Sequence, residues 1–472
     1  MKPFLAKGIC KLVKNKARKQ IIYDLLTNKR GGGESTNLAT NPLTLDEIRN
    51  FKSFSDYITS AQNINYTRLD SKLQAQFQSK IAQLKAKIKA RQKIKVCFYV
   101  IYDSVFPFKP LFEKMQSDSL FEPYVVIIPD TPRGESNMFY QVDKGYKSLS
   151  EKYGDFVHKC YDLQTKDFID FTPNMDILAT SQPYETMSNE IYSISYATSK
   201  QVLTIFAHYG METASWGKNE IVPIFALNLC WKIFVNTKYG FDEHQMLTLN
   251  SGKNAILSGY IKMDSLFQVK PQKSERKKII IAPHHTLDSA YNPNLRLSNF
   301  LQYADFFLEI YKRYPQIDFI FRPHPLLVIV LAKDEYWGQK KLDSYLAKLK
   351  TFKNVTYQEG GEYFETFVNS DGILHDCGSF IAEYLYTDNP CCFMLKDSAT
   401  NENNFALLGK ECLKHYYQAF NESDIIDFIE NVVIKGNDTK KAQRIKFAKE
   451  VLRVNFPNVA DKILDNIKSE LL

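Results

Sequence analysis

The chain has 472 residues, a mass of 54.7 kDa and a formal net charge of +8. Its composition, 44% hydrophobic and 24% charged, is that of soluble globular proteins and excludes wholesale disorder, collagen and low-complexity sequence. The longest strongly apolar run, 326–332, is far shorter than the roughly 20 residues that span a bilayer, which excludes membrane-spanning classes. At roughly 100–200 residues per domain, the length predicts two or three domains.

The cysteines and the first residues indicate the compartment. None of the 8 cysteines forms a CxxC pair, and lysines interrupt the first 20 residues, so neither a zinc ribbon nor a secretory signal is visible. A large chain without a cysteine framework is typical of a reducing compartment. We therefore expect a cytoplasmic protein with reduced thiols.

Residues 1–94 are predicted to form a basic helical N-terminal extension. Within 1–30, nine lysines and arginines stand against Asp24 alone, and apolar residues are interleaved with them. Such a segment can lie on an anionic membrane surface, and we expect this peripheral contact on the inner face of the cell membrane. A helix packed on the main body and a nucleic-acid-binding segment are the alternatives. After a Gly-Gly-Gly linker at 31–33, an apolar stripe from Leu69 to Ile88 predicts a helix.

From residue 95 onward, short β-branched and aromatic runs alternate with longer mixed segments. The predicted strands are 95–102, 124–129, 175–180, 202–207, 231–235 and 255–258, followed by 278–282, 318–321, 355–358, 372–375 and 391–395. Strands alternating with helices predict an α/β protein with two Rossmann-like, doubly wound domains that face a cleft. We place these domains at 95–265, for the acceptor, and 266–450, for a nucleotide donor. A C-terminal helix over 451–472 can cross back to the first domain.

Histidines lie at the ends of the predicted strands. In open α/β sheets, ligands bind beyond the carboxyl ends of the strands. Five of the 8 histidines fall at such ends, namely His208, His284, His285, His324 and His375. One histidine there is usually structural, but five indicate that at least two contact a ligand.

The segment after strand 372–375 predicts a phosphate site. Asp376 is followed by Gly378 and Ser379 at the start of a predicted helix, where free N–H groups and the helix dipole favour an anion. Glu383 is placed to accept hydrogen bonds from ribose hydroxyls. The alternative for Ser379 is an ordinary helix cap.

Two further histidine motifs follow strands of the second domain. Arg322 and His324 lie between prolines, and a cation with a histidine suits a diphosphate that gains charge as it leaves. His284 and His285 are adjacent, and neighbours on an extended strand point to opposite faces. We therefore expect hydrogen bonding to a donor here and no metal site.

His208 is the predicted general base of the first domain. It follows strand 202–207 and precedes Tyr209 and Gly210. An imidazole titrates near neutral pH and suits proton abstraction. A buried histidine bonded to a loop carbonyl is the structural alternative.

The ordered set of motifs resembles the CDP-glycerol glycerophosphotransferases, the teichoic-acid and capsule polymer enzymes, over about residues 170–400. His208 lies in a segment similar to the family's His-Gly element, and Gly259 and Lys262 lie in 259–264, which is similar to its Gly-Tyr-Pro-Arg-Asn-Asp. Residues 281–283 match the strand that ends Ala-Pro, and 322–325 match the His-Pro element. Residues 376–379, with Glu383, resemble its Asp-Tyr-Ser-Ser and acidic residue.

The resemblance implies a GT-B fold and a phosphotransferase activity. The catalytic residues would be His208, Arg322 and His324. The donor-binding residues would be Gly259, Lys262, His284, His285, Asp376, Gly378, Ser379 and Glu383. The chain departs from the family where Met211, Glu212 and Thr213 follow instead of Thr-Pro-Leu-Lys, and where Lys262 replaces arginine. These departures concern the glycerol part of the donor and the acceptor.

The resulting expectation is transfer of a phospho-polyol, above all glycerol phosphate, from a CDP-activated donor. The acceptor would be a hydroxyl of a cell-surface glycan or lipid-linked precursor, with CMP released and no cofactor, metal or nucleic acid involved. A glycosyltransferase of the same fold that uses a UDP- or CMP-sugar is the first alternative. A nucleic-acid-binding protein and a catalytically inactive scaffold are the others.

Overall fold

The computed structural model describes residues 43–49, 66–214, 224–272, 274–287, 296–396 and 404–472. The basic segment 1–30, on which the predicted membrane contact depends, lies outside these residues. Among the described helices, none is long and apolar enough to cross a membrane.

The first domain is built on a seven-stranded sheet in the order β3-β2-β1-β4-β5-β6-β7, and all neighbouring strands are parallel. Its strands are β1 (Ile94–Val100), β2 (Phe121–Ile127), β3 (Val157–Lys159), β4 (Ile177–Thr180), β5 (Leu203–Ala207), β6 (Lys232–Val235) and β7 (Ala255–Leu257). Its helices are α4 (Tyr66–Lys89), α5 (Lys109–Gln116), α6 (Glu135–Tyr153), α7 (Ile194–Ser199) and α8 (Lys238–Leu247).

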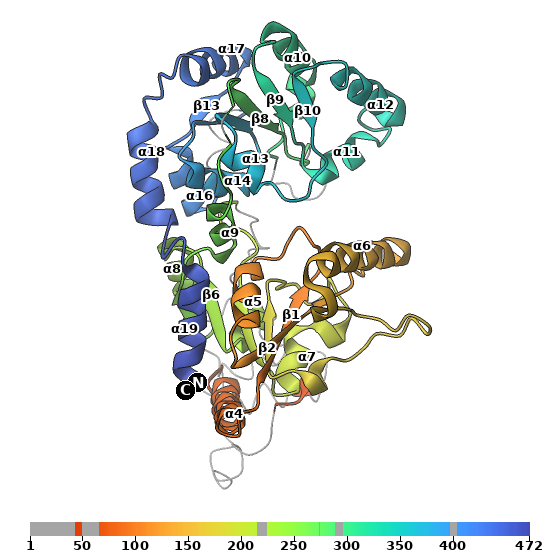
Figure 1. The fold of residues 1–472 in the computed structure, drawn as a ribbon, viewed down its shortest axis with the longest axis vertical. Coiled ribbons are helices and arrows are strands. Elements are labelled where there is room, and N and C mark those ends of the chain that lie inside the picture. Colours follow the sequence, from red (N-terminus) through yellow and green to blue (C-terminus); the bar gives the residue numbers. More distant parts are fainter. Residues whose placement is uncertain (1–42, 50–65, 215–223, 273, 288–295, 397–403) are drawn as a thin grey trace, which may run out of the picture.

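The second domain has a six-stranded parallel sheet in the order β10-β9-β8-β11-β12-β13. Its strands are β8 (Lys278–Ala282), β9 (Asp318–Phe321), β10 (Val355–Tyr357), β11 (Gly372–His375), β12 (Cys391–Met394) and β13 (Tyr417–Ala419). The two sheets form separate layers of the molecule, one above the other in Figure 1.

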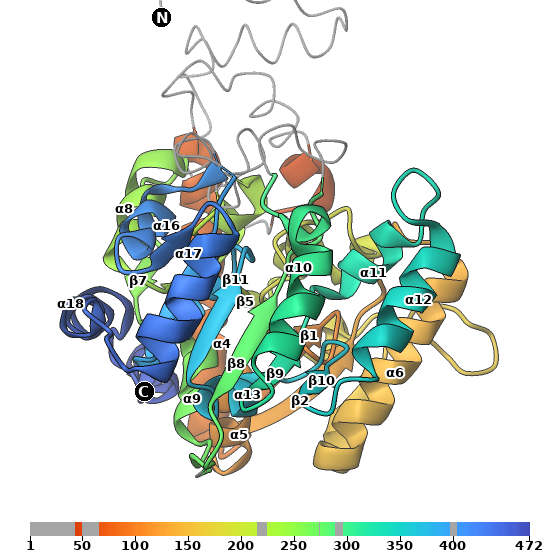
Figure 2. The same cartoon turned by 90° about the horizontal axis from the view of Figure 1, so that it is seen from above.

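Helices cover the second sheet, and α10 and α17 lie over the face that is turned to the viewer in Figure 2. The helices from residue 264 onward are α9 (Asp264–Phe267), α10 (Phe300–Arg313), α11 (Pro325–Leu331), α12 (Gly338–Leu349), α13 (Phe364–Val368), α14 (Phe380–Glu383), α16 (Leu407–Leu413), α17 (Glu422–Asp427), α18 (Lys441–Phe447) and α19 (Val459–Leu471). Two π-helical turns, Phe428–Ile434 and Ala448–Leu452, extend α17 and α18.

The sequence pattern explains the layers. The central strands are apolar on both faces and fully buried, as in β5 and β11, because helices cover both sides of a parallel sheet. The stripe predicted over Leu69–Ile88 faces the core of the first domain. The prediction of two doubly wound α/β sheets is therefore confirmed. The edge strands β3 and β13 were not predicted, because their sequences, Val-His-Lys and Tyr-Gln-Ala, are not apolar runs.

The C-terminal chain returns from the second domain to the first. Helix α19 packs against α5 and α4, so it lies beside the first sheet (Figure 1). The Asp264 carboxylate accepts a hydrogen bond of 2.8 Å from the backbone N–H of Ala460 in the first turn of α19. This return gives the two domains a second covalent connection besides the segment after β7.

Candidate functional site

The carboxyl ends of three adjacent strands bring the second domain's candidate residues to one edge. The strands β9, β8 and β11 are neighbours in the sheet. Arg322 and His324 follow β9, His284 and His285 follow β8, and Asp376 follows β11 directly. This is the edge at which ligands bind in open α/β sheets.

Three imidazoles meet at this edge. The ring centroids of His284 and His285 are 4.3 Å apart, and those of His285 and His324 are 4.2 Å apart. One ring nitrogen from each histidine lies within 4.8 Å of those of the other two. The expectation that His284 and His285 point to opposite faces is wrong, because β8 ends at Ala282 and both residues lie in the following loop.

The backbone fixes which nitrogen of two rings carries the proton. Nδ1 of His324 accepts from the N–H of Leu326 at 3.1 Å, and Nδ1 of His284 accepts from the N–H of Thr286 at 3.3 Å and lies 2.9 Å from the hydroxyl of the same residue. Burial lowers the pKa of His324 to about 3, so its ring is neutral and its proton is on Nε2. A metal ion needs a lone pair on either ring nitrogen, whereas an anion needs an N–H donor. The three rings are close enough together to hold a metal ion, and His284 and His324, with Nδ1 accepting from the backbone, present Nε2–H donors to an anion.

Asp376 positions the histidine loop. Its side chain is fully buried, and its carboxylate accepts from the N–H of His284 at 2.5 Å and from that of Asn299 at 2.6 Å. Burial raises the pKa of Asp376 to about 7, with the two backbone donors opposing the shift. Since both oxygens are bonded inside the protein, Asp376 supports His284 and the start of α10.

Gly378 and Ser379 lie where the two domains meet. The hydroxyl of Thr213, in the loop after β5, donates to the carbonyl of Gly378 at 2.7 Å. Ser379 is exposed at the start of α14, makes no capping hydrogen bond, and has its hydroxyl 3.3 Å from Sγ of Cys377. Of these two residues, only Ser379 has a side chain open to a ligand.

Glu383 and Lys262 form a buried network across the domain boundary. Oε1 of Glu383 accepts from the hydroxyl of Tyr260 at 2.8 Å and from Nζ of Lys262 at 3.2 Å, and Oε2 accepts from the hydroxyl of Tyr363. Glu383 is 1% exposed. Both of its oxygens are occupied by protein donors, so a ribose could bond to it only by replacing one of them.

Arg322 and Gly259 are also engaged by the protein. Arg322 donates to Oε1 of Gln358 at 2.9 Å and to the carbonyl of Gly361, and its guanidinium lies over the ring of Tyr363. Gly259 has φ +95°, and a Cβ there would lie 2.0 Å from the carbonyl oxygen of Val454. A glycine is required at this position because the returning C-terminal chain passes too close to leave room for a side chain.

His208 is placed at the carboxyl end of β5 but is buried. It is 1% exposed, and Nε2 lies 3.1 Å from Nε2 of His244 on α8. Nδ1 lies 3.4 Å from Oε1 of Glu212. His375 is structural, because Nδ1 interacts with Cys377 and Nε2 lies 3.3 Å from the hydroxyl of Tyr416.

Two functional candidates were missed by sequence reasoning. Glu212 was noted only as a departure from a motif, and His244 was not singled out because it does not lie at the end of a predicted strand. A signal for His244 was available, since it shares the buried face of α8 with Gly240, four residues earlier. A histidine on such a face needs a polar partner.

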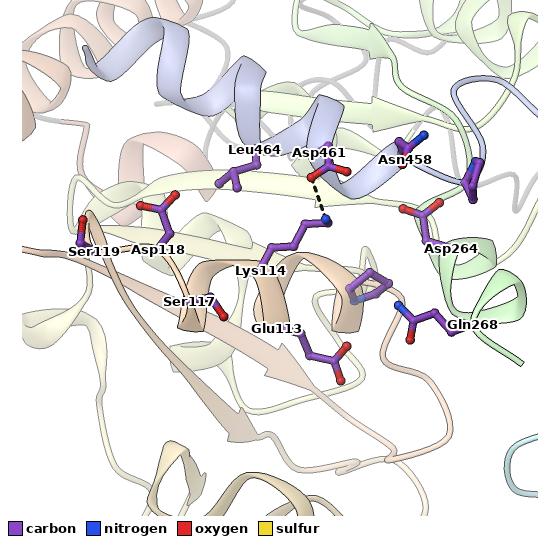
Figure 3. A pocket seen from close by; sticks show the side chains of 12 residues that line it. Glu113, Lys114, Ser117, Asp118, Ser119, Asp264, Gln268, Asn458, Asp461 and Leu464 are labelled. Carbon is purple, nitrogen blue, oxygen red and sulfur yellow. Dashed lines mark ion pairs between the residues drawn. The ribbon is translucent and has the colours of Figure 1, made fainter.

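One cavity lies away from these residues. It has a volume of about 630 Å³ and lies between α5, the region of α9 and the start of α19 (Figure 3). Its charged groups are paired within the protein, for example Lys114 with Asp461 at 2.7 Å. It contains none of the sequence-predicted site residues.

Comparisons with known proteins show the fold. No family model and no curated protein matches the chain. The wall teichoic acid polymerase TagF, in a variant soaked with CDPG, matches at 12% identity over 90% of this chain and 97% of that chain, with a TM-score of 0.51. A second TagF structure matches at 12% identity over 84% and 97%, with a TM-score of 0.53.

A UDP-GlcNAc 2-epimerase from Neisseria meningitidis, bound to UDP-GlcNAc, matches at 14% identity over 80% of this chain and 100% of that chain, with a TM-score of 0.50. These likenesses agree with the two parallel sheets. The chain has the predicted GT-B fold, and the resemblance to the teichoic-acid polymer enzymes extends to the structure of TagF.

Proposed function

We propose that the chain is a transferase that moves a phospho-polyol, most simply glycerol phosphate, from a CDP-activated donor to a hydroxyl of a glycan or lipid-linked acceptor. The acceptor oxygen attacks the distal phosphorus, the bond from that phosphorus to the bridging oxygen breaks, and CMP leaves. The acceptor proton passes to a base of the first domain, for which His208 is the candidate.

The observation that carries the proposal is the convergence of His284, His285 and His324 at the edge of the second sheet. Two of the three rings keep Nδ1 bonded to backbone N–H groups, which leaves Nε2–H as a donor. Donors preorganised in a buried place stabilise a diphosphate as negative charge develops on its leaving half. Positioning and charge stabilisation dominate phosphoryl transfer, so no covalent step on the protein is required.

Binding of nucleotides to the full chain tests the donor site. A ligand at 100 times its dissociation constant stabilises a protein by about 2.7 kcal/mol, which a thermal shift resolves. We expect stabilisation by CMP, CDP and CDP-glycerol but not by UDP or GDP. The shift should weaken in His285→Gln, whose half-buried ring has no hydrogen-bond partner at Nδ1, and persist in the matched surface variant His158→Gln. A uridine-selective shift would favour the glycosyltransferase alternative, and no shift with any nucleotide would exclude the donor site.

We also propose that the protein meets its acceptor at a membrane surface through residues 1–30. The support is their charge, nine cations against one carboxylate. Flotation with vesicles that contain anionic lipid should retain the full chain and lose a chain that starts at Asn37. Equal flotation of both would contradict the proposal.

A further inference from the structure

A buried polar cluster lies behind the carboxyl edge of the first sheet. His208 follows β5, Asn236 follows β6, Glu212 lies in the loop after His208, and His244 comes from α8. His208, Asn236 and His244 are each at most 1% exposed, and the side chain of Glu212 is 11% exposed. The reaction described above uses only His208 of these four.

Both nitrogens of His208 face protein groups. Nε2 lies 3.1 Å from Nε2 of His244, and Nδ1 lies 3.4 Å from Oε1 of Glu212. Apart from this approach and the amide of Asn236 beside Glu212, Nδ1 of His208, Nδ1 of His244 and both oxygens of Glu212 have no hydrogen-bond partner in their buried positions. Buried polar atoms with so few partners are unusual in a folded protein and indicate groups kept for a reaction.

The proton count distinguishes two arrangements. Burial lowers the pKa of His208 and of His244 to about 3, so both rings are neutral and each carries one proton. Only one of these protons can lie between Nε2 of His208 and Nε2 of His244. If His208 carries its proton on Nδ1, this proton faces Glu212 and Nε2 accepts from His244. In the other tautomer, Nδ1 of His244 would be a buried N–H without an acceptor, which native structures avoid.

The start of α8 lies beside the carboxylate of Glu212. A Cβ at Gly240, in the first turn of this ten-residue helix, would lie 3.3 Å from Oε2 of Glu212. The positive end of the helix dipole therefore lies beside the carboxylate. Burial raises the pKa of Glu212 to about 7, and the amide of Asn236 opposes this shift. The titratable groups of the cluster that face Glu212 are the imidazoles of His208 and, behind it, His244.

We propose that Glu212 and His244 are positioning residues of the His208 base. Glu212 accepts the hydrogen bond from Nδ1–H of His208. The Nε2–H of His244 donates to Nε2 of His208 until an acceptor hydroxyl takes the place of this donor. This inference rests on the proposed function. In the reaction, the O–H bond of the acceptor breaks and an N–H bond forms at Nε2, while its oxygen bonds to phosphorus. The Glu212 carboxylate then stabilises the imidazolium through Nδ1, as in other carboxylate–histidine pairs.

The tautomer of His208 tests the inference without any substrate. Full-length, deuterated protein labelled with ¹⁵N-histidine is observed by NMR at pH 8, and the His208→Gln variant identifies the resonances. We expect the proton on Nδ1 of His208 and on Nε2 of His244. A proton on Nε2 of His208 would overturn the inference, whether or not the protein binds CDP-glycerol. Absence of nucleotide binding would overturn the proposed function and leave the tautomer result valid.

Kinetic measurements distinguish a positioning role of Glu212 and His244 from a purely structural role. With CDP-glycerol as donor, Glu212→Gln should lower kcat about 100-fold with little change in KM, since a base of this kind contributes about 10²–10⁴-fold. His244→Gln, which keeps an N–H donor, should retain most activity, whereas His244→Leu should lower the KM of the acceptor by uncovering Nε2. Asp242→Asn is the matched control on α8, because its carboxylate pairs only with Lys238 among the ion pairs of the described helix. Equal loss of kcat in Glu212→Gln and Asp242→Asn, or an unchanged kcat in Glu212→Gln, would overturn the positioning role.

Discussion

The hydroxyl of Tyr260 lies 2.8 Å from Oε1 of Glu383, so one hydrogen bond joins the segment after β7 to the end of α14. The two residues are 123 positions apart in the chain. Tyr260 is 1% exposed and Glu383 is 1% exposed, so the bond is shielded from water. The same hydroxyl lies 2.8 Å from the carbonyl oxygen of Tyr209, which follows β5, so Tyr260 contacts both domains.

Tyr260→Phe should lower the free energy of unfolding by about 1–2 kcal/mol, because Glu383 loses one of its three donors in a buried place. The measurement is the denaturant midpoint of the full chain. The matched control is Tyr345→Phe, which removes a hydroxyl bonded to the carbonyl of Ala304 within the second domain. Small-angle scattering should show a more open particle for Tyr260→Phe alone. Identical scattering of both variants would show that this bond does not hold the domains together.

Gly259→Ala should prevent normal docking of the C-terminal chain. Its φ of +95° is unfavourable for alanine, and the added Cβ would lie 2.0 Å from the carbonyl oxygen of Val454. Gly134→Ala is the control, since Gly134 has φ +88° but open space around its Cβ position. The control should cost about 1 kcal/mol and Gly259→Ala clearly more. Equal melting temperatures would contradict the close approach to Val454.

Asp376→Asn should weaken CDP-glycerol binding about tenfold or more, because an amide cannot accept from two backbone N–H groups as a carboxylate does and the loop of His284 loosens. Asp371→Asn is the control at the other end of β11, where the carboxylate accepts from the N–H of Lys278 at 2.9 Å. Titration of both variants with CDP-glycerol in a calorimeter measures the two affinities. Unchanged affinity in Asp376→Asn would show that the His284 loop does not bind the donor.

Stability should fall as the pH is lowered from about 6.5 to about 4. Buried histidines whose folded-state pKa lies below the unfolded value bind protons more readily when unfolded, so their contribution is complete above pH 6.5 and is lost on acidification. Burial lowers the pKa of five histidines to about 3 or 4, namely His208, His244, His285, His324 and His375.

Three buried acids act in the opposite direction. Burial raises the pKa of Glu212 and of Asp376 to about 7 and that of Asp264 to about 6. Acidification protonates these carboxylates, removes an unfavourable buried charge and so stabilises the folded state. Five histidines outnumber three acids, so the urea midpoint should be lower at pH 5 than at pH 7. A midpoint at pH 5 equal to or above that at pH 7 would mean that these histidines are not buried as described.

The architecture could be predicted because it depends on local pattern. The strand predictions for 278–282, 318–321 and 372–375 match β8, β9 and β11 residue for residue. Apolar runs of four or five residues between helical segments are a strong signal for buried parallel strands. The same pattern placed the histidines at the strand ends, where the structure has them.

The directions of the side chains could not be predicted. His284 and His285 turn toward His324 because the strand ends before them, and no periodicity applies to a loop. Glu383 is occupied by Tyr260 and Tyr363, which come from other segments of the chain. Burial of His208 against His244 likewise joins two elements 36 residues apart. Such contacts arise only when the elements pack.

The central claim is that phosphorus is transferred from a cytidine donor. The most direct measurement is ³¹P NMR of the full chain incubated with CDP-glycerol and an isolated cell-surface glycan fraction. We predict that CMP appears while the distal phosphorus moves into a phosphodiester of the glycan, and that this stops in His285→Gln but continues in His158→Gln. If CDP-glycerol stays intact while a UDP- or CMP-sugar is consumed under the same conditions, the protein attacks a sugar carbon and the claim is wrong.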